Sequence, residues 1–379
     1  MRSEREIKKW KRDAEKLLEF DPYHLDELKA IEAVYRMSLG ERSNGKSYSV
    51  LDYFLTDYFL TGNQFGYVRR LESEIKGQAG AEVLAPFQHN GFIEFMSEGK
   101  YNAIKYQSRK WYLGYVDEDA HTKRWATEPV GFAFALNVAE STYKSRSYPG
   151  IKHILFDEFL TRSMPIQNEF VNYMNLLSTI IRYRNDVDVY MVGNTVDRHS
   201  IYFDEMGLNH VKDMKPGTID RYTYGKSGLS VAVEYTPNSE RGKPSDVYFA
   251  FDNPQLRMIT TGEWEIASYP HLDHGYRPAD VVFKFFVRYD GETLRCDIVN
   301  DSDGLYMFVF PVYVDIGDVT DTLVYTPDVD KRANYRTKLT TPMLPVEKKI
   351  NDILRSDKVF YATNKQGETM RSYLMWCRT

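Results

Sequence analysis

Eight consecutive residues, Gly40-Glu-Arg-Ser-Asn-Gly-Lys-Ser47, follow the pattern Gly-x-x-x-x-Gly-Lys-Ser. In such a loop the backbone N–H groups surround phosphate oxygens, the lysine contacts the β- and γ-phosphates, and the serine hydroxyl binds Mg²⁺. A helix that follows the loop adds the positive end of its dipole. The pattern predicts a nucleoside triphosphate site with Mg²⁺, and a glycine turn without a ligand is the alternative. The predicted binding residues are Gly40, Arg42, Ser43, Asn44, Gly45, Lys46, Ser47 and Tyr48.

Two adjacent acids, Asp157 and Glu158, end the apolar run that begins at Ile151. An acid at the tip of a buried strand beside a phosphate loop can hold the Mg²⁺ water shell, and a second acid can polarise an attacking water. This pair favours hydrolysis over transfer of the phosphoryl group to another molecule. The alternative is that both acids only solvate a strand end.

Other polar residues end the neighbouring predicted elements. Asn194 follows an apolar run and is placed to sense the γ-phosphate or the water, unless it is a turn residue. Arg182 and Arg184 end a helix, where a guanidinium could stabilise charge in a neighbouring subunit or simply suit the helix dipole. Arg69 and Arg70 end a strand and could contact the phosphates of nucleotide or of DNA.

The elements that must position these residues alternate between strands and helices. A strand from Tyr35 leads into the glycine-rich loop, and a helical stripe that includes Val50, Phe54 and Tyr58 follows it until Gly62. Strand, helix and strand in alternation imply an α/β fold with a mainly parallel sheet and helices on both faces. The further predicted strands are 64–70, 111–116, 131–137, 151–157, 187–194 and 228–236, and the further helices are 3–19 and 167–184.

The character of the chain changes after residue 236. A segment rich in Pro and Gly marks a boundary there, and residues 245–268 suggest a small helical connector. The residues beyond 275 indicate a three-strand antiparallel meander, followed by a helix at 344–355. The predicted strands of the meander are 281–289, 292–300 and 305–315, and the predicted domains are 1–236, 237–272 and 273–379.

Bulk properties exclude several classes of protein. The 379 residues are 42% hydrophobic and 27% charged, with a net charge of only −5, so DNA contacts must come from local basic patches. Apolar runs fall short of the ~20 residues of a membrane helix, the charged N-terminus is no signal peptide, and cytoplasm is expected. Cys296 and Cys377 form no motif and are expected to be reduced. His271 and His274 lack further ligands nearby in sequence and are expected at the surface.

The order of these pieces resembles the DNA-packaging ATPases of the phi29-like bacteriophages, ring-forming P-loop translocases of the ASCE class near the FtsK and HerA group. The likeness covers residues 35–200, and beyond residue 236 it depends mostly on layout and on the meander. The matching stretches are the glycine-rich loop, Gln-Phe-Gly-Tyr-Val-Arg-Arg at 64–70, Tyr-Pro-Gly-Ile-Lys-His-Ile-Leu-Phe-Asp-Glu-Phe at 148–159, Asn-Leu-Leu-Ser-Thr-Ile-Ile-Arg-Tyr-Arg at 175–184, and Gly-Asn-Thr-Val at 193–196.

The resemblance implies an ATP hydrolase that moves double-stranded DNA into an empty procapsid. Lys46 and Ser47 would bind phosphate and Mg²⁺, Asp157 would organise the metal and Glu158 would activate water. Asn194 would hold Glu158 inactive through a hydrogen bond. Arg182 falls where the family places an arginine finger that acts on the neighbouring subunit. Lys144, an exposed loop cation when taken alone, falls where the family has a basic residue that reaches the neighbour's nucleotide.

The resemblance also implies a ring, expected to be a pentamer, on the portal (connector) vertex of the procapsid in the cytoplasm of an infected bacterial host. Whether a structural RNA takes part stays open. A C-terminal domain with an RNase H-like α+β fold would complete the chain. Its first predicted strand carries no acid, and Asp297, Asp301 and Asp303 make no obvious metal site, so we expect it not to cut DNA.

Three alternatives remain at the level of sequence. The first is an unrelated P-loop ATPase or kinase that acts without DNA. The second is a nucleotide-binding structural protein without turnover, against which Glu158 argues. The third is a packaging motor whose C-terminal domain is an active nuclease.

Overall fold

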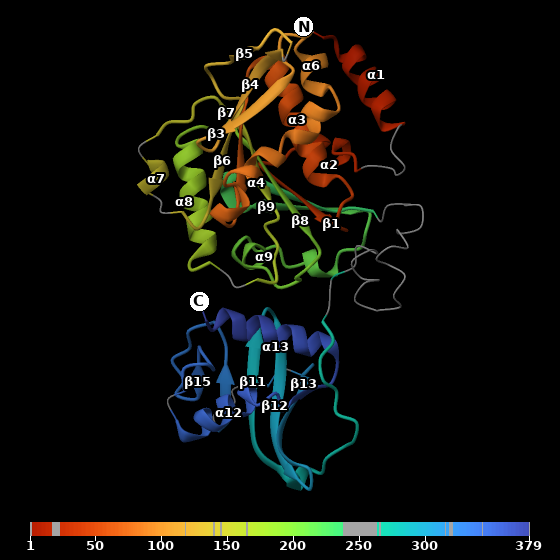
Figure 1. The fold of residues 1–379 in the computed structure, drawn as a ribbon. Coiled ribbons are helices and arrows are strands. Elements are labelled where there is room, and N and C mark those ends of the chain that lie inside the picture. Colours follow the sequence, from red (N-terminus) through yellow and green to blue (C-terminus); the bar gives the residue numbers. More distant parts are fainter. Residues whose placement is uncertain are drawn as a thin grey trace. The chain divides into compact units, whose positions relative to one another are not determined.

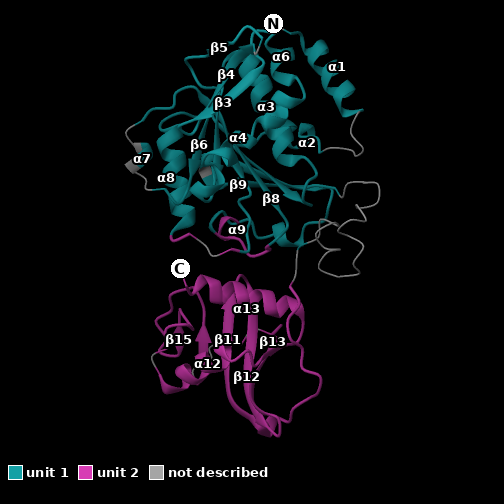
Figure 2. Cartoon of the chain, in the orientation of Figure 1, with its two compact units in different colours: residues 1–162, 168–196, 205–264 teal, residues 163–167, 197–204, 265–379 magenta. Residues whose placement is uncertain are grey.

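The structure is a computed structural model that describes residues 2–16, 23–117, 119–138, 141–144, 146–163, 166–237, 264, 267–314, 316–317, 321–342 and 344–378, without the side chains of residues 141, 144 and 226. The chain forms two compact units, coloured separately in Figure 2. The first unit comprises residues 1–162, 168–196 and 205–264, and the second comprises 163–167, 197–204 and 265–379. The predicted helical connector at 245–268, and with it most of the predicted linker domain 237–272, lies outside the described residues.

The first unit is built on one sheet with a parallel centre (Figure 1). Within the described residues, ten strands pair in the order β3-β4-β6-β2-β7-β8-β1-β10-β9, with β5 beside β4. The six central strands, in sheet order β6, β2, β7, β8, β1 and β10, are parallel to one another. The strands β3, β4, β5 and β9 join antiparallel at the edges. The predicted mainly parallel sheet is confirmed. The bounds are β1 Tyr35–Gly40, β2 Gln64–Arg69, β3 Ala103–Gln107, β4 Lys110–Asp117, β5 Thr122–Trp125, β6 Gly131–Ala135, β7 Ile151–Asp157, β8 Asp188–Asn194, β9 Thr218–Tyr224 and β10 Leu229–Tyr235.

Helices cover both faces of this sheet, as predicted. The ring of Phe54 in α3 lies 5.5 Å from that of Tyr190, in the same core cluster as Leu155. Tyr173 in α8 lies 4.7 Å from Phe156, the next residue on β7. Because successive side chains of a strand point to opposite faces, α3 and α8 lie on opposite sides of the sheet. The helix bounds are α1 Glu4–Glu15, α2 Asp26–Ala30, α3 Lys46–Thr61, α4 Gln78–Glu82, α5 Ala85–His89, α6 Phe92–Met96, α7 Ser141–Lys144 and α8 Glu169–Ile181. The short helix α9, Ile201–Glu205, belongs to the second unit except for its last residue.

Several details differ from the prediction. The helix expected at 167–184 is shorter, because Asn168 and Arg182 both adopt positive φ angles, of 54°, and so bound α8. The strands β3, β5 and β9 and the helices α4 to α6 were not predicted. These elements are short or polar, and β5 and β9 lie at the margin of the sheet, where no continuous apolar run is needed. No described helix has both the length and the apolarity to cross a bilayer.

The second unit contains the predicted antiparallel meander. In its described residues, six strands pair in the order β15-β14-β11-β12-β13-β16. The strands β11, β12 and β13 are antiparallel, whereas β14 runs parallel to β11 and β15 parallel to β14, which agrees with the predicted RNase H-like class. The predicted helix at 344–355 is confirmed, and a second helix was missed. The bounds are β11 Val281–Tyr289, β12 Glu292–Asp301, β13 Gly304–Pro311, β14 Leu323–Tyr325, β15 Tyr335–Arg336, β16 Val359–Tyr361, α12 Pro345–Arg355 and α13 Asn364–Trp376.

Candidate nucleotide site

The glycine-rich loop joins β1 to α3 in a conformation that only glycine allows at its ends. Gly45 precedes α3 with a φ of 92°, and a Cβ atom on Gly40 would lie 1.9 Å from Oγ1 of Thr236. The side chain of Asn44 fixes the loop from within, because its Nδ2 donates to Thr236 Oγ1 at 3.3 Å and its Oδ1 accepts from the backbone N of Lys46 at 3.3 Å. The side chain of Asn44 is buried and shapes the loop.

The ammonium group of Lys46 is buried beside neutral oxygens. Its Nζ donates to the carbonyl of Glu41 at 2.5 Å and to Oδ1 of Asn44 at 3.0 Å, and Oδ1 of Asn194 lies 3.5 Å away. These contacts fix the side chain within the loop. Lys46 occupies the lysine position of the Gly-x-x-x-x-Gly-Lys-Ser pattern, which contacts the β- and γ-phosphates of a nucleotide.

Ser47 and Asp157 meet at the end of β7. The hydroxyl of Ser47 donates to Oδ1 of Asp157 at 2.6 Å, and the hydroxyl of Tyr67 donates to Oδ2 at 2.8 Å. Burial, and then the negative charge of Asp157, raise the pKa of Tyr67 well above its usual value, so this hydroxyl keeps its proton and remains a donor. Ser47 and Asp157 would hold Mg²⁺. No group of three His, Cys, Asp or Glu residues suited to a metal occurs in the described part of the chain.

Glu158 lies next to this pair but is held by an arginine that the sequence did not assign to it. Nη2 of Arg69 lies 2.6 Å from Oε2 of Glu158 and 3.1 Å from Oε1 of Glu74, while Nη1 lies 3.6 Å from Oδ2 of Asp157. The side chain of Arg69 is 13% exposed and that of Glu158 is 55% exposed. Arg69 reaches Glu158 because β2 pairs directly with β7.

The predicted hydrogen bond between Asn194 and Glu158 is wrong for this structure. Within the described residues, the carboxylate of Glu158 accepts from Arg69, and the amide of Asn194 lies beside Lys46. Asn194 pairs with Gly40 across the parallel strands β8 and β1, which sets it next to the phosphate loop. It thus keeps a place from which to sense a γ-phosphate, though not through Glu158.

Two further predictions need correction. Arg69 and Arg70 are not placed to contact DNA, because Arg69 faces the acids of the site and Arg70 is buried against Glu169. Nε and Nη2 of Arg70 each lie 2.7 Å from an oxygen of that carboxylate. The side chain of Tyr48 does not face the loop either. It stacks on Phe87 with ring centroids 4.5 Å apart, so only its backbone N–H is left for a nucleotide.

Of the remaining predicted residues, Arg42, Ser43 and Arg182 lie on the surface. Arg42 and Ser43 occupy the exposed turn of the loop, where Ser43 has a φ of 57°. Lys144 ends α7, and its side chain lies outside the described part. Nη2 of Arg182 donates to the carbonyl of Arg146, two residues after Lys144, at 2.9 Å.

Arg184 lies at the start of β7, at the opposite end of this strand from Asp157. Its guanidinium donates to the carbonyls of Pro149 at 2.9 Å and of Ile151 at 2.7 Å, at the first residue of β7. Asp157 is the last residue of that strand, about 20 Å away at about 3.3 Å per residue. Arg184 therefore ties the end of α8 to the start of β7, at the opposite end of this strand from Asp157.

Comparison with known proteins agrees with this arrangement. Residues 15–222 match the family described as podovirus DNA encapsidation protein (Gp16). A DNA packaging protein of Bacillus phage PZA is 28% identical over 313 residues, which cover 81% of this chain and 83% of that protein.

Two solved structures share the fold over nearly the whole chain. The phi-28 gp11 DNA packaging motor superposes with a TM-score of 0.52 and 16% identity, over 94% of this chain and 98% of that one. The bacteriophage phi-29 viral genome packaging motor assembly superposes with a TM-score of 0.50 and 19% identity, over 93% and 99%. At these identities the likeness concerns the fold.

Proposed function

Because this chain belongs to the podovirus DNA encapsidation protein family, it is a DNA-packaging protein, and we propose that it works as an ATP-driven motor. The observation that carries the proposal is that Lys46 and Ser47, which follow β1, lie beside Asp157 and Glu158 at the end of β7, with β8 between these two strands. The family indicates that the chain packages DNA, and these four side chains could carry out the ATP hydrolysis that drives packaging.

ATP is the proposed substrate. The backbone of the loop and Lys46 would bind its phosphates, while Mg²⁺, held by Ser47 and Asp157, would neutralise part of their charge. Glu158 is the proposed general base, since its carboxylate is half exposed and is the group of this site that can reach solvent. To accept a proton from water, Glu158 must first leave Arg69, so that contact would hold the base at rest.

The proposed arginine finger is Arg182, acting on a neighbouring subunit. Support comes from its neighbour Arg184, which binds the carbonyl of Ile151 at the start of β7, about 20 Å along the strand from Asp157 of the same chain. Lys144 would act from the same side, and Asn194 would sense the γ-phosphate. Such sharing makes hydrolysis depend on how subunits sit against one another, which is the property that a ring motor needs.

The ring, expected to be a pentamer, would dock on the portal vertex of a procapsid in the host cytoplasm and move double-stranded DNA through its centre. Grip on DNA would come mainly from phosphate contacts, independent of sequence and weakened by salt. These contacts are proposed to lie elsewhere than Arg69 and Arg70, whose guanidinium groups face Asp157 and Glu169.

Turnover in mixed rings tests this proposal. We expect Arg182→Ala and Glu158→Gln proteins each to lose ATP turnover, and their mixture to regain part of it, because a Glu158→Gln subunit still supplies its finger to an Arg182→Ala neighbour. A mixture of Lys46→Ala with Glu158→Gln is the control, since both defects lie in the same half of the site and no intact site can form. Equal failure of the two mixtures at every ratio, with duplex DNA present, would refute action between subunits.

The second unit is proposed not to cleave DNA. Support comes from Asp297 on β12, whose carboxylate is buried and engaged by Nε of Arg295 at 2.7 Å and by the hydroxyl of Tyr276 at 2.9 Å. A nuclease of this class needs carboxylates that are free to bind two metal ions. Conversion of supercoiled plasmid by the full chain with Mg²⁺ or Mn²⁺, abolished by Asp297→Asn, would contradict this assignment.

A further inference from the structure

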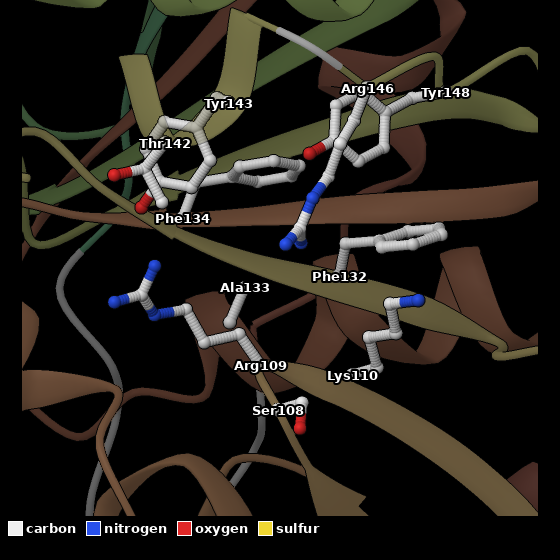
Figure 3. Close-up of a pocket in the computed structure, with 10 residues that line it drawn as sticks. All are labelled: Ser108, Arg109, Lys110, Phe132, Ala133, Phe134, Thr142, Tyr143, Arg146 and Tyr148. Carbon is white, nitrogen blue, oxygen red and sulfur yellow. The ribbon is translucent and has the colours of Figure 1, made fainter. Parts of the chain in front are cut away.

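A hollow of about 310 Å³ lies in the first unit away from the nucleotide site. Its walls come from the turn between β3 and β4, from β6, and from the segment that begins with α7 (Figure 3). None of the lining residues belongs to the phosphate loop, to α3 or to β7. The residues that matter here are Ser108, Arg109, Lys110, Phe132, Arg146 and Tyr148.

The hollow is lined by cations and hydrogen-bond donors, without any carboxylate. Arg109 forms an ion pair with Glu72, outside the lining. No carboxylate of the described residues lies within ion-pair distance of Lys110 or Arg146. In Figure 3 the guanidinium of Arg109 lies on the side of Thr142 and Tyr143, and that of Arg146 lies on the side of Phe132 and Tyr148. A ligand that fits must therefore be an acceptor with negative charge.

Aromatic rings form the floor around these cations. The rings of Phe132 and Tyr148 meet edge to face at 5.2 Å, and Nζ of Lys110 lies 5.6 Å from the centre of Phe132. Tyr148 is 5% exposed, so this floor is largely dry. Charge–charge attraction is stronger beside such a wall than in open solvent, because less water screens it.

The turn that carries Arg109 is strained in a way that glycine would relieve. Ser108 and Arg109 have φ angles of 53° and 60°, in the left-handed region that hairpin turns of two residues normally fill with Asn and Gly. Backbone strain at non-glycine residues persists where the side chain has a use. Here the strained residue is one of the three cations of the hollow.

We propose that this hollow binds a phosphate group. Arginine and lysine beside hydroxyl donors match the charge and the acceptor oxygens of phosphate, and the volume admits one such group with its ester substituents. The phosphate could come from a free nucleotide or pyrophosphate, or from the backbone of a nucleic acid. The proposal does not depend on ATP hydrolysis at Lys46 and can fail or succeed separately from it.

Calorimetric titration of the full-length Lys46→Ala protein with pyrophosphate tests the site, because this background removes the main phosphate contact of the nucleotide site. We expect saturable binding that Arg146→Ala or Lys110→Ala, added to that background, weakens by about tenfold or more. Lys123→Ala is the matched control, since it removes one exposed charge from β5, outside the hollow. Undetectable binding, or equal loss in the Lys123 control, would overturn the proposal.

A labelled DNA duplex then separates the two sources of phosphate. If the hollow takes backbone phosphates, pyrophosphate displaces the duplex and Arg146→Ala weakens duplex binding. If it takes free phosphate, duplex binding is unchanged in the variant whose pyrophosphate binding is lost. Arg109→Gly separates binding from folding, because glycine relieves the positive φ at this position. We expect this variant to keep its thermal stability while its affinity for pyrophosphate falls severalfold. Unchanged pyrophosphate affinity in Arg109→Gly would remove the turn from the site.

Discussion

Each of the two units contains an ion pair between an arginine and a carboxylate, Arg69 with Glu158 in the first unit and Arg295 with Asp297 in the second. The two ion pairs differ in how readily they separate. In the first unit, Arg69 holds Glu158 at 2.6 Å while 55% of the Glu158 side chain remains exposed. In the second unit, Arg295 grips Asp297 through two nitrogens, at 2.7 and 3.1 Å, and the side chain of Asp297 is 3% exposed.

This difference separates a carboxylate that can react from one that supports the fold. An exposed ion pair contributes at most about 1 kcal/mol, so thermal motion or a ligand can release Glu158 from Arg69. Breaking a buried pair leaves an uncompensated charge and costs about 3 to 5 kcal/mol, so Asp297 is fixed. An acid beside an arginine is thus no evidence for catalysis until the exposure of the acid is known.

The largest effect is expected from Glu158→Gln. If this exposed carboxylate is the general base, the variant should lose about a thousandfold in ATP turnover and still bind ATP, because the amide cannot take a proton from water. Nucleotide binding by fluorescence and phosphate release by a coupled assay measure the two properties. Glu74→Gln is the matched control, since Glu74 contacts the same arginine but not Asp157, and it should turn over normally. Normal hydrolysis by Glu158→Gln would show that another group is the base.

Arg295→Ala tests the buried side of the comparison. Removing the guanidinium leaves Asp297 buried with Tyr276 as a remaining donor, and we expect the second unit to lose about 2 to 3 kcal/mol of unfolding free energy at neutral pH. Denaturant unfolding followed in the second unit measures the loss. The double variant Arg295→Ala with Asp297→Asn should recover most of it, because the unpaired charge is gone. Additive losses in the double variant would mean that Arg295 acts through packing on Phe310 instead.

Those parts of the fold and site that depend on local sequence were predictable. The glycine-rich loop, the apolar run before Asp157 and the stripe of α3 each specify one element and the polar residue at its end. Strand–helix alternation then fixed a mainly parallel sheet, because parallel strands require crossover connections. The meander of the second unit could also be predicted, because its tight turns are specified by local sequence.

The partners of individual side chains were not predictable, because they depend on which strands lie side by side. Arg69 reaches Glu158 only because β2 pairs with β7, a contact between residues 89 positions apart. Arg70, the next residue, points to the other face and is buried by Glu169 from α8. Two adjacent arginines at the end of β2 therefore have unrelated roles, and no sequence pattern distinguished them.

Glu234 is a third kind of carboxylate, buried and paired with a hydroxyl in place of a cation. It lies on β10 opposite Ser38 and accepts a hydrogen bond from Tyr23, and burial raises its pKa to about 7 from an ordinary 4.5. The folded chain therefore keeps a proton that the unfolded chain loses above pH 4.5. Stability should fall as pH rises from about 4.5 to about 7, and then level off.

Glu234→Gln should abolish that fall. The variant and the wild-type protein should have similar stability near pH 4.5, and the variant should be more stable by about 2 kcal/mol at pH 8. Denaturant unfolding of the first unit at pH 5, 6 and 8 measures the difference. Parallel curves for the two proteins would show that Glu234 titrates normally in the folded state.

The smallest expected effect is that of Arg69→Ala on turnover without DNA. If the exposed pair restrains Glu158, its loss should free the base and raise ATP turnover by about fivefold, the factor that corresponds to an ion pair of about 1 kcal/mol. If duplex DNA stimulates turnover by releasing Glu158 from Arg69, that stimulation should shrink by the same factor in the variant. ATP affinity must be measured in parallel, since Arg69 also lies 3.6 Å from Asp157. A fall in turnover with unchanged ATP affinity would mean that Arg69 orients Glu158 for catalysis. Glu158 and Asp297 would then differ only in how far their side chains are exposed.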